Sequence, residues 1–69
     1  MTPRQAKEII RQRLAELNLP AFRLSAKTID FSDLARARCI FVKLHGWAPS
    51  PLYRELDLTA RANDFRIEA

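Results

Sequence analysis

The chain has 69 residues, of which 48% are apolar and 29% charged, and its formal net charge is +4. This composition is typical of a folded chain, and the length allows one small domain over residues 1–69. One cysteine and one histidine exclude an internal disulfide and a metal site built from those two side chains alone. We expect a cytoplasmic protein in a reducing compartment without membrane binding, because no apolar run reaches roughly 20 residues and the opening residues lack a signal-peptide core.

The first predicted element is a helix over residues 3–17. Thr2 can cap it, Pro3 suits the first helical position, and Gln5 completes a capping box with Thr2. Asn18 suits a left-handed residue at the end of the helix. Apolar residues recur at spacings of three and four, which predicts one buried stripe made of Ala6, Ile9, Ile10, Leu14 and Leu17.

Two strands are predicted next. Residues 22–29 change to a period of two, and residues 39–47 are rich in β-branched and aromatic side chains. Between them, residues 30–38 fit either a short helical turn, capped by Asp30 or Ser32, or an extended connection.

A second helix is predicted over residues 51–63, with Ser50 as its cap and Pro51 at the first helical position. Residues 65–68 alternate like a final short strand that lies beside either of the other two. The order α-β-β-α-β predicts an α+β fold, a two-layer sandwich with both helices on one face of a small, mainly antiparallel sheet. The strand residues expected to face the helices are Phe22, Leu24, Ala26, Ile40, Val42, Leu44, Phe65 and Ile67.

The segment from Leu17 to Ser50 carries a pattern of its own. It comprises Leu19-Pro20-Ala21-Phe22-Arg23-Leu24-Ser25, a polar stretch through Phe31-Ser32, Ile40-Phe41-Val42-Lys43-Leu44 and Gly46-Trp47-Ala48-Pro49. This pattern resembles the small helix-hairpin-helix (α-β-β-α) domains associated with large polyvalent proteins of phages and conjugative elements. The resemblance implies this fold class and an origin in a mobile element, and it implies no catalytic residue. The chain departs from the pattern in its added terminal strand and in Leu34-Ala35-Arg36-Ala37, which replaces a glycine-rich turn.

Residues with catalytic chemistry are few. Cys39 and His45 lie six residues apart on one predicted strand, about 20 Å at ~3.3 Å per residue, which is outside hydrogen-bond reach. Asp30 and Asp33 fit the start of a helix, where capping explains acidic residues. A single glycine excludes a glycine-rich phosphate loop. We therefore expect no enzyme activity, no cofactor and no metal.

The sheet face turned away from the helices is the candidate for function. It would display cations and aromatic rings together, namely Arg23, Lys27, Phe41, Lys43, His45 and Trp47, with Ser25 between them and Arg66 adjoining. Rings that stack on bases and cations that neutralise phosphates are typical of surfaces that bind single-stranded nucleic acid. Residues 1–46 hold nine cations and four anions, which favours this interpretation. On the first helix, Arg4, Lys7 and Arg11 recur along one edge. These cations either contact a phosphate backbone or form an ordinary solvated face of the helix.

Two alternatives fit the same aromatic residues. Phe41 and Trp47 complete a small core if the chain around residues 31–38 or the loop after Trp47 covers them. They otherwise form a homodimer or partner interface, where aromatic residues are enriched. The sequence thus predicts a non-enzymatic binding module from a phage, prophage or plasmid that binds nucleic acid. The alternative is a protein-interaction or self-associating accessory domain that binds a host or mobile-element protein.

Overall fold

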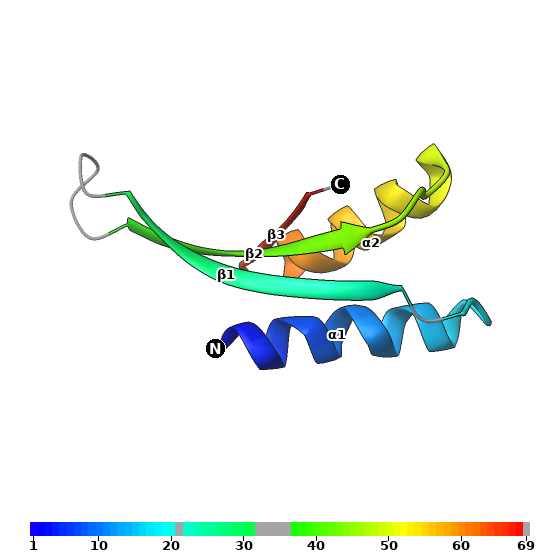
Figure 1. Cartoon of the computed structure of the whole chain (residues 1–69), viewed down its shortest axis with the longest axis horizontal. Helices are drawn as coiled ribbons and strands as arrows, with labels where there is room; N and C mark the ends of the chain where they lie inside the picture. Colours follow the sequence, from blue (N-terminus) through cyan, green and yellow to red (C-terminus); the bar gives the residue numbers. More distant parts are fainter. Residues whose placement is uncertain (21, 32–36, 69) are drawn as a thin grey trace.

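The computed structural model describes residues 1–20, 22–31 and 37–68 (Figure 1). Its elements are α1 (Pro3–Glu16), β1 (Arg23–Phe31), β2 (Ala37–His45), α2 (Ser50–Ala62) and β3 (Arg66–Glu68). The strand order is β1-β2-β3, with β2 antiparallel to β1 and parallel to β3. The expected α+β order and mainly antiparallel sheet are confirmed, and β3 lies beside β2.

The start and end of α1 follow from local sequence. Thr2 Oγ1 accepts a hydrogen bond from the Gln5 N–H at 3.2 Å, and Gln5 Oε1 accepts one from the Thr2 N–H at 2.7 Å, so the predicted capping box is present. At the other end Asn18 adopts φ 57°, and the next N–H, of Leu19, bonds to the Leu14 carbonyl at 3.0 Å. The predicted left-handed residue is therefore present, and the helix ends at Glu16, one residue before the predicted end.

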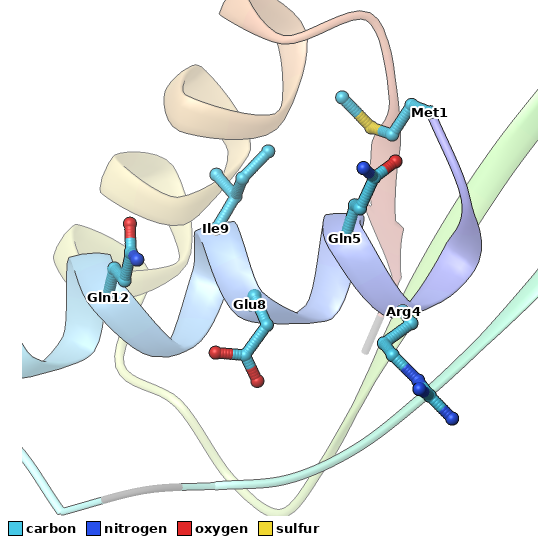
Figure 2. Close-up of a pocket in the computed structure, with 6 residues that line it drawn as sticks. All are labelled: Met1, Arg4, Gln5, Glu8, Ile9 and Gln12. Carbon is cyan, nitrogen blue, oxygen red and sulfur yellow. The ribbon is translucent and has the colours of Figure 1, made fainter.

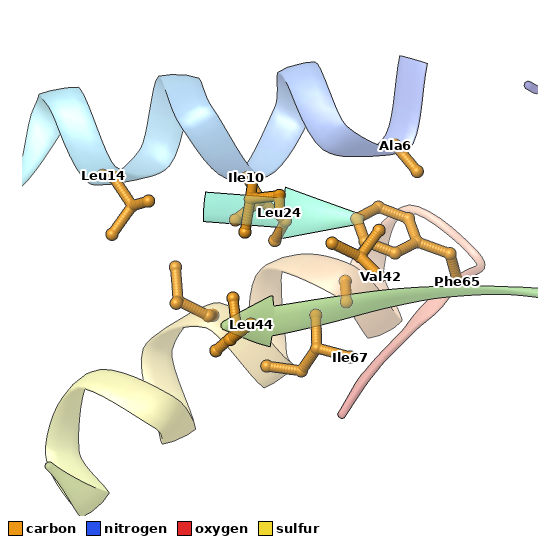
Figure 3. Close-up of a cluster of buried hydrophobic side chains, with 10 residues drawn as sticks. Ala6, Ile10, Leu14, Leu24, Val42, Leu44, Phe65 and Ile67 are labelled. Atoms are coloured by element: carbon orange, nitrogen blue, oxygen red, sulfur yellow. The ribbon is translucent and has the colours of Figure 1, made fainter. Parts of the chain in front are cut away.

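The core lies on one face of the sheet, beneath both helices. Pairing places Leu24 opposite Leu44, and Val42 opposite both Ala26 and Ile67, so side chains from all three strands point the same way. Figure 3 shows these side chains meeting those of α1 in one cluster. The buried residues are Ala6, Ile10, Leu14, Leu24, Val42, Leu44, Leu56, Ala60, Phe65 and Ile67. The predicted parity of the strands is therefore confirmed.

The bounds of the strands differ from the prediction. Each strand of the hairpin takes in two residues of the expected connection, because β1 ends at Phe31 and β2 begins at Ala37. Figure 1 shows this hairpin extending beyond the N-terminal end of α1. The choice between a helical turn and an extended connection for residues 32–36 lies outside the described residues.

The predicted ends of β2 and α2 were wrong by one or two residues. Strand β2 stops at His45, because Gly46 adopts φ 143° and turns the chain away before Trp47. Pro49, not Ser50, is the N-cap of α2, and it has no side-chain oxygen to accept a capping hydrogen bond. Ser50 is instead the first helical residue.

One ion pair joins the two helices at the surface. Arg13 Nη2 on α1 lies 3.0 Å from Glu55 Oε2 on α2, and its Nη1 lies 3.2 Å from Glu16 Oε1. The hydrogen bonds that Arg13 donates to Glu55 and, second, to Glu16 raise the pKa of Arg13 above its usual value. The guanidinium is therefore already engaged by carboxylates of the protein itself.

Candidate functional site

The alternation of the strands creates a second sheet face, away from the core. We call it the open face and define it as Arg23, Ser25, Lys27, Phe41, Lys43, His45, Arg66 and Glu68. These residues form three rows across the strands. Arg23 pairs with His45 in the first row, Lys43 joins Ser25 to Glu68 in the second, and Phe41 joins Lys27 to Arg66 in the third.

The predicted site residues differ in how much of each side chain reaches solvent. Arg23, Lys27, Lys43 and His45 are exposed, whereas Phe41 is half-buried between its neighbours. Trp47 is 82% exposed, so it is not a core residue of this chain. Because Gly46 interrupts the strand, the parity argument that placed Trp47 on the same face as Phe41 does not apply. Trp47 lies in the loop that follows the first row.

Two polar contacts cross the open face. Ser25 Oγ lies 2.8 Å from His45 Nε2, joining β1 to the end of β2. Lys27 Nζ lies 3.9 Å from Glu68 Oε1, so this pair spans all three strands. Sequence reasoning missed Glu68 as a residue of this surface. Its position two residues after Arg66 in an alternating segment was the available signal.

The excess positive charge of the protein gathers on the open face. That face carries four cations and one anion, a net charge of +3, not counting His45. On the helices, Arg11 pairs with Glu8 at 2.6 Å and Arg61 with Asp57 at 3.0 Å, whereas Arg4, Lys7 and Arg54 are in no ion pair of the described residues. Within residues 1–20, 22–31 and 37–68, no ion pair involves Arg23, Lys43 or Arg66. The open face therefore has cations left to contact an anionic partner.

Comparisons of the chain with protein-family models, with curated proteins and with solved structures gave no significant match. None of the helices in the described part of the chain combines the length and the apolar character that crossing a bilayer requires.

The arrangement of Cys39 and His45 does not form a catalytic pair. Both lie on β2, six residues apart, and each has a different local partner. The half-buried Cys39 thiol donates to the Ile40 carbonyl at 3.7 Å, whereas His45 contacts Ser25. Among the residues with described positions, no group of three His, Cys, Asp or Glu side chains could hold a metal ion.

The volume and the lining of the surface hollows indicate what kind of ligand the protein could bind. One of about 460 Å³ runs along α1, lined by Met1, Arg4, Gln5, Glu8, Ile9 and Gln12 (Figure 2). Its lining holds no nucleophile or histidine, and Glu8 is paired with Arg11. The hollow on the open face, around Phe41, measures only about 70 Å³. Because small-molecule sites typically enclose about 300 Å³ or more, the open face suits an extended ligand.

Proposed function

We propose that the protein is a small, non-enzymatic module that binds single-stranded nucleic acid through its open face. The observation that carries this proposal is the gathering of four cations from three strands around Phe41, on the sheet face opposite both helices. A phosphate backbone laid across the rows would meet these cations in turn, and their neutralisation of phosphates would supply most of the affinity.

The two aromatic residues of the predicted site, Phe41 and Trp47, differ in how well each could stack on a base. Phe41 is half-buried among charged neighbours, so little of its ring is left to contact a base. Trp47 is 82% exposed in the loop that follows His45, so most of its surface is accessible to a partner. We therefore assign base stacking to Trp47 and phosphate contacts to the rows beside it.

A single strand suits this surface better than a duplex. Bases in a duplex are stacked and paired, and they are read by elements that enter a groove, most often a helix. Both helices of this protein pack on the other face of the sheet. Unstacked bases of a single strand, in contrast, can lie on an exposed indole ring. The expected mobile-element origin and cytoplasmic location stay predictions.

The test makes the same charge-reversing substitution at two arginines, one on the open face and one on a helix. Arg23→Glu reverses a charge on the open face, and Arg54→Glu makes the same change at an exposed position of α2. We expect a thymidine oligonucleotide to bind at about 50 mM salt and to lose affinity as salt rises. Arg23→Glu should weaken binding several-fold more than Arg54→Glu. Absence of binding at low salt, or equal effects of the two variants, would overturn the proposal.

The exposure of Trp47 also favours a second candidate function, a protein-interaction or self-associating domain. A tryptophan that is 82% exposed is typical of a residue that a protein partner covers in an interface. Salt separates the two functions, because an apolar interface between proteins depends little on ionic strength while phosphate contacts depend on it steeply. Sedimentation over a range of protein concentrations would detect self-association directly.

A further inference from the structure

His45 carries the imidazole group of the open face, and imidazole is the side-chain group that proteins most often use to change charge near neutral pH. It is the last residue of β2, it is exposed, and Arg23 of β1 lies opposite it. Lys43 precedes it by two residues on the same face, and Glu68 of β3 lies in the row of Lys43. Both helices are on the core side of the sheet. Among the described residues, the charged group in the row of His45 is therefore Arg23. The next row holds the cation Lys43 and, beyond it, the carboxylate of Glu68.

Ser25 can hold the imidazole ring in both of its protonation states. Its Oγ lies 2.8 Å from His45 Nε2, and a hydroxyl group can either donate or accept a hydrogen bond. When Nε2 has no proton, the Ser25 hydroxyl donates to it; when Nε2 carries a proton, that N–H donates to Ser25 Oγ. Protonation therefore changes the charge of the row without requiring the ring to move.

The neighbouring cations make this charge sensitive to a bound polyanion. Arg23 lies opposite His45, and Lys43 lies on the same face, so phosphates held by these two cations would lie beside the imidazole. Phosphates bound along the first two rows would offset both cations and attract the imidazolium directly. A ligand that favours the protonated ring must itself be bound more tightly when the ring is protonated, because the coupling is reciprocal.

We propose that His45 couples the binding of a single-stranded polyanion on the open face to the uptake of one proton. This inference rests on the proposed function. The proton passes from solvent to an imidazole nitrogen, and no covalent bond to the ligand forms. Affinity should therefore be higher at a pH where the imidazole carries the extra proton than at a pH where it does not.

The test uses a thymidine oligonucleotide, because neither thymine nor a phosphodiester titrates between pH 5 and 8, roughly the range where histidine changes charge. We expect the dissociation constant to fall roughly fivefold between about pH 7.5 and about pH 5.5 at constant ionic strength. His45→Gln should remove this pH dependence. His45→Arg places a permanent positive charge at this position, so it should bind the oligonucleotide equally tightly at both pH values. Calorimetry in two buffers with different ionisation enthalpies should detect proton uptake by the unchanged protein and none by His45→Gln.

The outcomes separate the inference from the function on which it rests. Binding that is equally tight at both pH values, or a pH dependence that survives in His45→Gln, would overturn the proton coupling and leave the binding function standing. Circular dichroism at both pH values checks that the fold is the same. No binding of the oligonucleotide at either pH would overturn both proposals.

Discussion

Gly46 packs against the ring of Phe22, and a Cβ atom at Gly46 would lie 3.4 Å from Phe22 Cδ1 and 3.5 Å from Cε1. Phe22 directly precedes β1 and Gly46 directly follows β2, so the contact joins the two strands at the end that carries the first row. Gly46 also adopts φ 143°, a conformation that residues with a side chain rarely adopt. The backbone conformation therefore favours glycine at this position, whereas the distance to Phe22 is an ordinary van der Waals contact.

Replacement of this glycine should therefore destabilise the fold. We expect Gly46→Ala to lower the free energy of unfolding by about 1–3 kcal/mol, because a residue with a Cβ atom is strained at this φ. Urea denaturation followed by circular dichroism measures the change. Gln12→Ala, at an exposed position of α1, serves as control and should change stability little. A Gly46→Ala protein as stable as the original would contradict the backbone conformation at this turn.

Two leucines of α2 provide a matched test of the core. Leu56 is 0% exposed, and Leu58, two residues later, is 57% exposed. Leu56→Ala should lower the free energy of unfolding by about 2–5 kcal/mol, because it removes buried methyl groups and leaves a cavity. Leu58→Ala should change it by about 0.5 kcal/mol or less. Similar effects of the two changes would show that α2 is rotated relative to the sheet.

A milder change covers the case in which Leu56→Ala does not fold. Ile10 is fully buried on α1, and Ile10→Val removes a single methylene from the same core. We expect a loss of about 0.5–1.5 kcal/mol, small enough for a cooperative unfolding transition to be measured. A variant with unchanged stability would place Ile10 outside the tightly packed part of the core.

The start of the two helices gives a third prediction. Thr2→Ala removes a side-chain acceptor that receives the Gln5 N–H, so it should destabilise the protein by about 1 kcal/mol. Ser50→Ala changes the first residue of a helix whose N-cap is Pro49, so no capping bond is lost. Thermal unfolding of both variants makes the comparison. If Ser50→Ala lost more stability than Thr2→Ala, Ser50 would be the N-cap of α2 after all, which would contradict the structure.

Trp47 gives the fourth prediction, on binding rather than folding. Since its ring is 82% exposed, Trp47→Ala should leave the unfolding transition within about 0.5 kcal/mol of the original. Loss of base stacking should weaken oligonucleotide binding by about 1–3 kcal/mol. In the unchanged protein, the emission of Trp47 should resemble that of an indole in water and should shift when the oligonucleotide is added. An emission maximum typical of a dry interior would contradict the exposed position.

The features that the sequence predicts well depend on neighbours along the chain. The Thr2 and Gln5 capping box lies within four residues, and the parity that buries Val42 and Leu44 follows from simple alternation. The end of β2 was predicted too late, because the hydrophobic pattern continues to Trp47 while the backbone of Gly46 turns the chain.

The contacts that give the open face its chemistry depend on register, which alternation alone does not fix. The 2.8 Å contact between Ser25 and His45 is diagonal, because Ser25 lies opposite Lys43 in this register and His45 lies opposite Arg23. The pair formed by Lys27 and Glu68 requires in addition that β3 run parallel to β2 on the side away from β1. Long-range pairing of this kind had no local signal in the sequence.

The alternation along β2 has a consequence for how such a protein can evolve. Val42 and Leu44 point into the core, and Phe41, Lys43 and His45 point away from it, so the two sets share a strand but not a packing environment. Substitutions in the second set alter the charge and shape offered to a partner without disturbing the buried layer. Mutations at alternate codons of this strand can therefore change the outward-facing surface while the buried layer beneath it is inherited unchanged.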